Sequence, residues 1–504
     1  MVNCALGVDI GTSSSKGVVV DVATGEVLAT SVVAHDVDRP HTGFVQMDGR
    51  IWWDEFVTIA HALKEDLAQQ GIEWTITSVG VSGMGPCVLL VDENDEPVYP
   101  AILYGVDTRA TQQIESMRHE LGDDAIADVG GSLLTSQAGG PKIVWIQENA
   151  PDAYSQATRL FMPASFLARK LTGAYTLDHQ SASQVTPLYE VDHERWHEDW
   201  WHRYAPGLEA PQLVWAGDIV GSVTDEAAAL TGISAGTPVI AGSIDAWTEA
   251  VSVGAHNDGD LMLMYGTTMF LVATGQDTLR SPSMWTTVGV FPGSRNLAGG
   301  LATSGALTAW VKDLTGEDFG QLLAEAKESP TGANGLLMLP YFAGERTPIL
   351  DPDARGVIAG LTLQHGRGDL YRAALEATAF GVRHNIETMR EAGADIRRVV
   401  AVGGGTQGQL WLQIISDVTG IAQVVPRTTV GASYGAAFLA AVAVSEPGVA
   451  PLLEDWNPVA TIIEPDSTKT AFYDGLYQHY RDLYTSTVPI VHALAHHQRM
   501  EGNS

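Results

Sequence analysis

A turn rich in glycine and hydroxyl residues, set between two apolar runs, is the feature of this sequence that says most about its fold. It occupies residues 9–16, and the β-branched residues on both sides of it indicate two strands joined by a tight connection. Gly11 lets a ligand approach the backbone, and the turn amides can donate to phosphate oxygens together with the hydroxyls of Thr12, Ser13 and Ser14. The pattern predicts a phosphate-binding hairpin, and an ordinary polar hairpin is the alternative.

Two charged residues flank this turn. Asp9 closes the first apolar run and is short and rigid enough to hold a hydrated Mg²⁺ beside bound phosphates. Lys16 opens the second run, where its charge can offset that of a polyphosphate. We therefore predict Asp9 as a metal-binding residue and Lys16 as a nucleotide-binding residue.

The same pattern recurs half a chain later. Residues 260–275 again read as an apolar strand, a Gly266-Thr267-Thr268 turn, a second apolar strand and a closing glycine. One repeat over this distance indicates a duplicated domain and not a solenoid. We expect two similar domains to face one ligand, so that a polyphosphate between them is held from both sides.

A third glycine cluster extends the nucleotide site. Residues 398–402 read as a buried strand, and Gly403, Gly404 and Gly405 follow it before a helix-like run. Glycines at such a junction let a flat or charged ligand lie close to the backbone, which suits the ribose and adenine end of a nucleotide. The remaining glycines assigned to the nucleotide site are Gly305 and Gly408.

A candidate base lies between the two hairpins. Residues 238–244 read as a buried strand that runs through small residues into the start of a helix, so Asp245 is expected at the carboxyl end of a strand, at the mouth of a cleft. The alternative is a helix N-cap aspartate. Both can hold at once, because a capping position also fixes the direction of a carboxylate.

These motifs resemble the FGGY family of carbohydrate kinases, which belong to the wider actin, sugar-kinase and chaperone-ATPase fold. The resemblance includes the segments 340–348, 356–361 and 369–376, and it is strongest to xylulose kinases and their near relatives. It implies an α/β protein with two ribonuclease-H-like domains around a central cleft, and we place them at residues 1–254 (sugar and first hairpin) and 255–504 (ATP binding). It also implies MgATP as phosphoryl donor, and Asp245 as the residue that takes the proton from the sugar hydroxyl.

The sugar site departs from the xylulose kinase pattern. Where those enzymes usually carry glutamine, methionine and histidine, this chain has Gly83, Met84 and Gly85, so one hydrogen-bond partner for the sugar is missing. Met84 and Gly85 are still assigned to the substrate. Asp107 and Arg109, in a segment with one extra residue, either line the substrate pocket or form an interior ion pair or helix cap. D-xylulose is the first choice of acceptor, and other pentuloses, gluconate and erythritol are the alternatives.

Composition narrows the classes of function. A chain of 504 residues is too long for one core, and a formal charge of −32 opposes binding to nucleic acid or to an anionic membrane. The two cysteines suggest no disulfide framework, and no export signal or membrane-spanning run is recognised. We expect a cytoplasmic enzyme that can form a homodimer, with a small sugar and MgATP as its partners. An actin-type chaperone or filament protein and a catalytically inactive sugar sensor are the other classes considered.

Two expectations concern the last part of the chain. Residues 435–444 read as a buried, alanine-rich helix too short to span a membrane. After about Leu483 the chain is expected to end in a frayed terminus.

Overall fold

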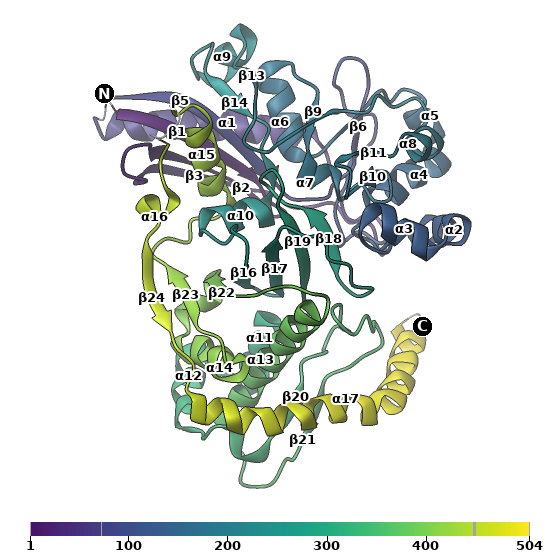
Figure 1. Ribbon diagram of the computed structural model, residues 1–504, viewed down its shortest axis with the longest axis vertical. Coiled ribbons are helices and arrows are strands. Elements are labelled where there is room, and N and C mark those ends of the chain that lie inside the picture. Colours follow the sequence, from purple (N-terminus) through teal and green to yellow (C-terminus); the bar gives the residue numbers. More distant parts are fainter. Residues whose placement is uncertain (1, 72, 447–449, 503–504) are drawn as a thin grey trace.

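Two β-sheets, one in each half of the chain, organise the molecule (Figure 1). The structure is a computed structural model, and it describes residues 2–71, 73–446 and 450–502. Helices cover the faces of both sheets, and no helix in the described ranges is long and apolar enough to cross a membrane.

The first sheet contains the hairpin expected around Gly11. Its strands, in spatial order, are β13 (Ile219–Ser222), β14 (Pro238–Ile240), β5 (Trp74–Gly83), β1 (Val2–Ile10), β2 (Ser14–Asp21) and β3 (Val27–Ala34), and β15 (Ser243–Ile244) pairs with the end of β5. Strand β1 is antiparallel to β2 and parallel to β5. It is buried along most of its length, as a central strand covered on both faces requires.

The second sheet repeats this order. Its strands are β18 (Trp285–Val288), β19 (Arg295–Leu301), β17 (Met269–Gly275), β16 (Asp260–Tyr265), β22 (Arg398–Val402), β23 (Gln423–Pro426) and β24 (Val459–Ile463). Strand β16 is antiparallel to β17 and parallel to β22, just as β1 relates to β2 and β5. Each sheet also has an antiparallel edge strand, β13 or β24. The expectation of two similar sheets built on two hairpins is therefore confirmed.

Smaller elements complete the lobes. The helices of the first half are α1 (Arg50–Gln69), α2 (Thr111–Leu121), α3 (Asp123–Gly130), α4 (Gly139–Asn149), α5 (Pro151–Tyr154), α6 (Pro163–Thr172), α7 (His179–Ala182), α8 (Glu198–Tyr204), α9 (Asp225–Thr231) and α10 (Asp245–Ser252). Those of the second half are α11 (Gly305–Thr315), α12 (Phe319–Glu328), α13 (Arg367–Glu391), α14 (Gln409–Thr419), α15 (Ala432–Ala443), α16 (Leu453–Trp456) and α17 (Ser467–Gly502), with 3-10 turns η1 (Ala333–Gly335) and η2 (Gly404–Gln407). Short strand pairs are β4 (Gln46–Met47) with β7 (Ala101–Ile102), β6 (Leu89–Val91) with β8 (Arg159–Phe161), β9 (Thr176–Asp178) with β12 (Gln212–Val214), β10 (Tyr189–Glu190) with β11 (Arg195–Trp196), and β20 (Leu337–Leu339) with β21 (Val357–Ala359).

Helix α15 is the buried, alanine-rich helix expected near residue 440, and it lies against the first sheet although it belongs to the second half of the chain. Glycines make this contact possible. A Cβ atom at Gly7 would lie 1.9 Å from the carbonyl oxygen of Ser433, and one at Gly80 would lie 2.0 Å from that of Ala436. A single cut in the sequence therefore does not separate the two lobes completely. The domain boundary near residue 254 remains a prediction.

Helix α17 replaces the frayed terminus expected after Leu483. It continues to Gly502 with Pro489 inside it, and Figure 1 shows it bending toward its end. Its first half is held by Tyr473, Tyr477 and Tyr480, which are at most 1% exposed and pack against Phe380 of α13. Tyrosines three or four residues apart lie on one helix face, so this face docks on the second lobe.

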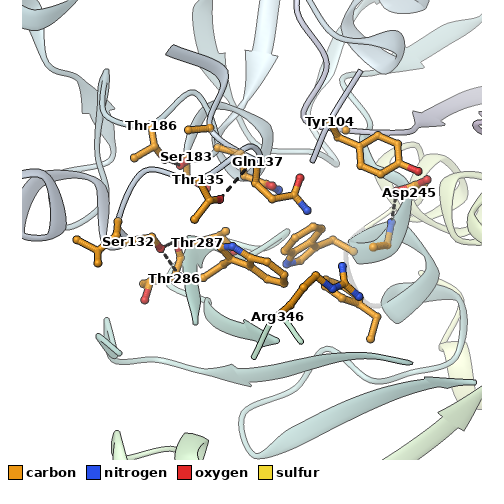
Figure 2. Close-up of a pocket in the computed structure, with 18 of the residues that line it drawn as sticks. Tyr104, Ser132, Thr135, Gln137, Ser183, Thr186, Asp245, Thr286, Thr287 and Arg346 are labelled. Carbon is orange, nitrogen blue, oxygen red and sulfur yellow. Dashed lines mark hydrogen bonds between the residues drawn. The ribbon is translucent and has the colours of Figure 1, made fainter. Parts of the chain in front are cut away.

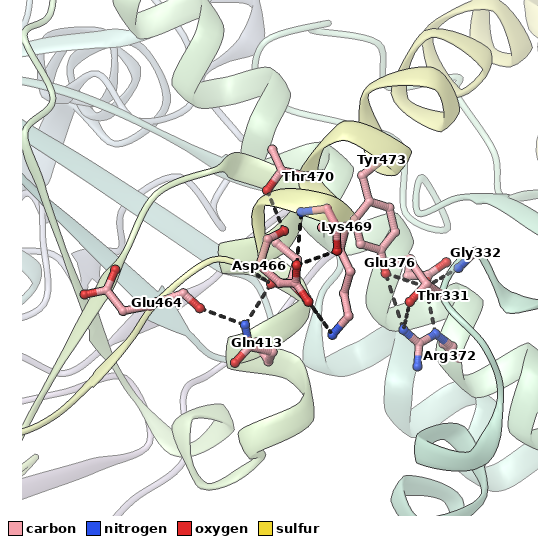
Figure 3. Close-up of polar contacts among 12 residues, drawn as sticks. Thr331, Gly332, Arg372, Glu376, Gln413, Glu464, Asp466, Lys469, Thr470 and Tyr473 are labelled. Atoms are coloured by element: carbon pink, nitrogen blue, oxygen red, sulfur yellow. Dashed lines mark hydrogen bonds and ion pairs between the residues drawn. The ribbon is translucent and has the colours of Figure 1, made fainter.

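A buried polar network reinforces this contact (Figure 3). The guanidinium of Arg372 donates to Glu376 Oε1 at 2.8 Å, and the Tyr473 hydroxyl donates to the same oxygen at 2.7 Å. The Gly332 amide also donates to it. A charged pair buried this deeply needs such additional hydrogen bonds to offset the loss of hydration.

Candidate active site

The first predicted turn joins β1 to β2 in the expected form. The Gly11 amide donates to the Ser14 carbonyl at 3.0 Å, which closes the turn, and the Thr12 hydroxyl lies 2.9 Å from that of Tyr104. Ser13 is exposed at the tip. The turn therefore lies next to Tyr104, which lines the pocket described below.

A buried trio lies behind this turn that the sequence did not signal. His35 directs Nε2 to the carbonyl oxygen of Gly11 at 3.1 Å and Nδ1 to Glu55 Oε2 at 2.9 Å. The Ser15 hydroxyl donates to the same carboxylate. The trio fixes the Gly11 peptide plane and so the direction of the neighbouring amides.

The second turn joins β16 to β17 and is closed by a similar bond that spans one residue fewer. The Gly266 amide donates to the Thr268 carbonyl at 3.1 Å, while the amides of Gly305 and Ala306, at the start of α11, donate to the carbonyls of Gly266 and Thr267. A Cβ atom at Gly305 would lie 2.6 Å from the Gly266 carbonyl oxygen. Gly305 therefore holds the turn in place by close packing.

The third glycine cluster follows β22 as expected, but its members differ in what they touch. Gly403 has a φ of 92° and packs on the backbone of Tyr265, so its smallness serves the fold. A Cβ atom at Gly405 would lie 2.9 Å from the side chains of Trp411 and Tyr265, and one at Gly408 would lie 3.3 Å from the Gly405 carbonyl. Only Gly404 has no heavy atom of the described residues within 4 Å of such a Cβ, so of the four it alone opens directly to space for a ligand.

Three carboxylates and one lysine meet near the first turn. Burial raises the pKa of Asp9, and the negative charge of Asp245 raises it further. Burial also raises the pKa of Glu249, to about 7, with Asp245 again adding to the shift. Burial lowers the pKa of Lys16, whose Nζ donates to the Val430 carbonyl. A cluster with this excess of negative charge is suited to a cation.

The residues present fit a magnesium ion. Asp9 Oδ1 is buried and has no hydrogen-bond partner among the described residues. Within the described ranges no group of three or more His, Cys, Asp or Glu residues is spaced to hold a metal. Mg²⁺ is usually bound by one or two carboxylates, with water and substrate phosphates completing the shell, so Asp9 suffices as the protein's anchor.

Asp245 is the first residue of α10. The N-cap position is Ile244, which makes no side-chain cap, and Asp245 Oδ1 accepts from the Ala246 amide at 2.7 Å. The alternative of a helix N-cap aspartate is therefore wrong by one position. Burial raises the pKa of Asp245, and its carboxylate lines a pocket between the lobes.

This pocket has a volume of about 220 Å³. Figure 2 shows Asp245 at one end and Ser132 at the other, with Tyr104 and Gln137 on one side and Arg346 opposite them. Apolar walls come from Trp247, Phe270 and Trp285. Hydroxyl and amide groups come from Ser132, Thr135, Gln137, Ser183, Gln184, Thr186, Thr268, Thr286 and Thr287. Such a mixture of aromatic and hydroxyl groups suits a small polyhydroxylated ligand.

The predicted substrate residues occupy different places. Gly85 lines the pocket, whereas Met84 is fully buried and forms no part of the pocket wall. Asp107 and Arg109 form the interior ion pair, at 2.7 Å with both side chains 0% exposed. Asp107 Oδ2 also accepts from the Val45 amide. The pair is satisfied internally, and neither residue lines the pocket.

Known proteins resemble this chain over nearly all of its length. The FGGY family of carbohydrate kinases matches twice, its N-terminal domain over residues 4–252 and its C-terminal domain over residues 261–444. The xylulose kinase of Escherichia coli (strain K12) is 28% identical over 493 residues, which are 96% of this chain and 99% of that protein. That of Staphylococcus xylosus is 25% identical over 487 residues, 95% of this chain and 99% of the other. The crystal structure of xylulose kinase from Rhodospirillum rubrum superimposes with a TM-score of 0.90 at 28% identity, covering 97% of this chain and 100% of that one. These matches confirm the expected α/β fold with two sheet-containing domains.

Proposed function

This chain belongs to the FGGY family of carbohydrate kinases, and from that premise we propose that it transfers the γ-phosphoryl group of MgATP to a hydroxyl of a small ketose, with D-xylulose as first candidate. One observation carries the proposal. Asp245 and Thr268 line the same pocket, and Tyr104 of that pocket lies 2.9 Å from Thr12 of the first turn. This arrangement supports a site in which Asp245 acts as the base, the pocket holds the acceptor and both turns bind phosphate.

The proposed reaction is an in-line displacement at phosphorus. Asp245 accepts the proton of the attacking hydroxyl, and the acceptor oxygen forms its bond to the γ-phosphorus as the bond to ADP breaks. The amides of the two turns hold the phosphates, with Lys16, Thr12 and Gly404 nearby. Asp9 would hold Mg²⁺, which neutralises charge on the phosphates when bound.

The acceptor is proposed from similarity and from the pocket. Xylulose kinases are prominent among the relatives, and hydroxyl-bearing residues dominate the polar lining. Gly85, however, brings no side chain to the wall. This difference favours a second candidate, a kinase for another pentulose, for gluconate or for erythritol, since a missing donor changes which hydroxyls are held.

A substrate panel tests the proposal. ADP release is measured with pentuloses, polyols and sugar acids, each at several concentrations, in the presence of MgATP. We expect the highest kcat/KM with D-xylulose. A higher kcat/KM with gluconate or erythritol would replace the acceptor but keep the class of reaction, whereas no ADP release above the sugar-free rate with any of them would contradict the kinase proposal.

A further inference from the structure

Arg346 brings a partly buried positive charge to the wall of the pocket. Its Nη2 donates to the Leu301 carbonyl at 2.9 Å, but its Nε is buried and has no hydrogen-bond partner among the described residues. The adjacent Glu345 directs Oε1 to the amides of Ala302 and Arg346. A buried N–H donor without a partner is costly, so the arrangement points to an acceptor supplied by a ligand.

The loop that carries Arg346 is held rigidly on both sides of it. Glu345, 5% exposed, accepts from the Ala302 amide at 2.7 Å. Thr347, 1% exposed, donates to Asn385 Oδ1 at 2.6 Å and accepts from the Gly300 amide. Arg346 is therefore clamped to the end of β19, and its guanidinium needs little reorganisation to bind a ligand.

The same scaffold supports the second phosphate turn. The chain leaves β19 at Leu301 and enters α11 at Gly305, whose amide donates to the Gly266 carbonyl at 2.9 Å. Arg346 and Thr268 line one pocket, and in Figure 2 Arg346 lies toward the Asp245 end. The guanidinium therefore shares one pocket with Asp245 and with Thr268 of the second turn.

We propose that Arg346 binds the phosphoryl group during transfer, donating N–H groups to its non-bridging oxygens. The inference rests on the proposed kinase function. As the acceptor oxygen bonds to the γ-phosphorus, the bond to the β–γ bridging oxygen breaks, its electron pair leaves with ADP, and the hydroxyl proton goes to Asp245. Charge on the three equatorial oxygens is then shared by a planar fork of donors.

The other end of the pocket explains why the acceptor does not need this arginine. Ser132, Thr135, Ser183 and Thr186 supply uncharged donors and acceptors there, and Gln137 does so between the two ends. Neutral groups of this kind match sugar hydroxyls, whereas a rigid guanidinium matches a group with several negatively charged oxygens.

Two variants and one control test the assignment. Arg346→Gln removes the charge, and Arg346→Lys keeps the charge but loses the fork. Arg355→Gln is the control, because Arg355 lies further along the same chain segment and contacts Gln498 and the Pro352 carbonyl away from the pocket. Each folded variant is assayed with MgATP and D-xylulose, or with the panel acceptor that the unchanged enzyme phosphorylates fastest. Calorimetry gives the dissociation constants of MgATP and of that acceptor. It also gives the dissociation constant of MgADP with and without fluoroaluminate, which mimics the phosphoryl group in the transition state of transfer.

We expect Arg346→Gln to lower kcat by about 10²–10³-fold, with both dissociation constants within about threefold of the original. Fluoroaluminate should lower the dissociation constant of MgADP in the unchanged protein and in Arg355→Gln but not in Arg346→Gln. In Arg346→Lys the decrease should be intermediate. A weakened acceptor with fluoroaluminate tightening intact would overturn the proposal, because Arg346 would then bind the sugar. The calorimetric comparison needs no turnover, so it still decides the role of Arg346 if no acceptor is phosphorylated. If no acceptor is phosphorylated, the proposed function fails, but the role of Arg346 can still be tested. That role is overturned if fluoroaluminate changes the affinity for MgADP equally in the unchanged protein and in Arg346→Gln, or changes it in neither.

Discussion

At the scale of single residues, Asp245 both begins a helix and lines the pocket. It begins α10, where a negative charge interacts favourably with the helix N-terminus, and it also faces the pocket. One oxygen is engaged by the Ala246 amide, which fixes the direction of the carboxylate. The second oxygen is the one that we propose accepts the proton of the acceptor hydroxyl.

Asp245→Asn separates the two roles. If the carboxylate is the base, kcat should fall by about 10²–10⁴-fold while the dissociation constant of MgATP hardly changes, because asparagine keeps the size but loses the basic oxygen. Steady-state kinetics and calorimetry measure the two quantities. Asp225→Asn is the matched control, since Asp225 is the exposed first residue of α9. An Asp245→Asn enzyme that keeps most of its turnover rules out this role.

The carboxylates around Asp245 also predict a dependence of stability on pH. The folded-state pKa of Glu249 is raised by burial from 4.5 to about 7, so the folded protein binds more protons than the unfolded chain. Its contribution to stability is therefore present below about pH 4.5 and lost as the pH rises to about 7. At pH 8, Glu249→Gln should increase the free energy of unfolding by about 1–3 kcal/mol and so raise the melting temperature. At pH 4.5 it should change the melting temperature little. Thermal melts at both pH values check this. An equal shift at both would assign the effect to packing instead.

How far single residues could be predicted depends on the range over which their environment is set. The positions of Asp9, Gly11 and Asp245 in the fold could be predicted, because a strand end, a turn and the start of a helix are local in sequence. The pocket wall was not, since Ser132, Gln137, Thr186 and Trp285 meet only after both lobes have packed. The ion pair of Asp107 and Arg109 shows the same limit, because nothing in its spacing distinguishes a buried pair from a pocket-lining one.

At the scale of elements, the two hairpins act as equivalent parts, and the second can be tested alone. A Cβ atom at Gly266 would meet the Thr268 carbonyl oxygen at 3.1 Å, so Gly266→Val needs only a small backbone adjustment while its methyl groups enter the phosphate path. We expect the dissociation constant of MgATP to rise at least tenfold, measured by calorimetry. Gly275→Val is the control, because Gly275 lies at the end of β17 that is remote from this turn, and a Cβ atom there would lie 3.9 Å from its nearest neighbour. Unchanged affinity in a folded Gly266→Val protein would remove the second turn from the site.

Helix α13 carries two similar ion pairs that differ in burial, which allows a direct comparison. Arg372 and Glu376 are 8% and 3% exposed, whereas Arg383 and Glu387 are 18% and 35% exposed, and in each pair a tyrosine of α17 donates to the glutamate. Glu376→Gln should cost about 3–5 kcal/mol, because it leaves the Arg372 charge buried without its counter-ion. Glu387→Gln should cost only about 0–1 kcal/mol. Guanidinium unfolding measures both, and equal costs would contradict a role for burial.

Elements were predicted well where one pattern sufficed and poorly where tertiary contacts decide. The strand and helix around Gly403 follow the apolar pattern. The continuation of α17 past Pro489 could not be predicted from such a pattern, since a proline inside a helix usually kinks or ends it. The tyrosines of α17 that dock on α13 stabilise the earlier turns, which local propensity does not reveal.

At the scale of the whole molecule, the pocket is lined from both halves of the chain, so its shape depends on how the lobes meet. We expect the lobes to close when acceptor and nucleotide are both bound, because an open site would let water compete for the phosphoryl group. Small-angle scattering should then show a smaller radius of gyration with D-xylulose plus a non-hydrolysable ATP analogue than with either ligand alone. Identical curves for all samples would exclude closure with these ligands.

The contact of α15 with Gly7 and Gly80 bears on how the protein is made. On the ribosome, β1 and β5 are complete long before residues 432–443 exist, so one face of the first sheet stays uncovered during synthesis. At translation rates of 5–20 residues per second, the wait from residue 80 to residue 443 lasts about 20–70 s. The nascent first lobe must therefore remain exposed to chaperones for most of translation, and a chain truncated after the first lobe lacks the helix that closes it.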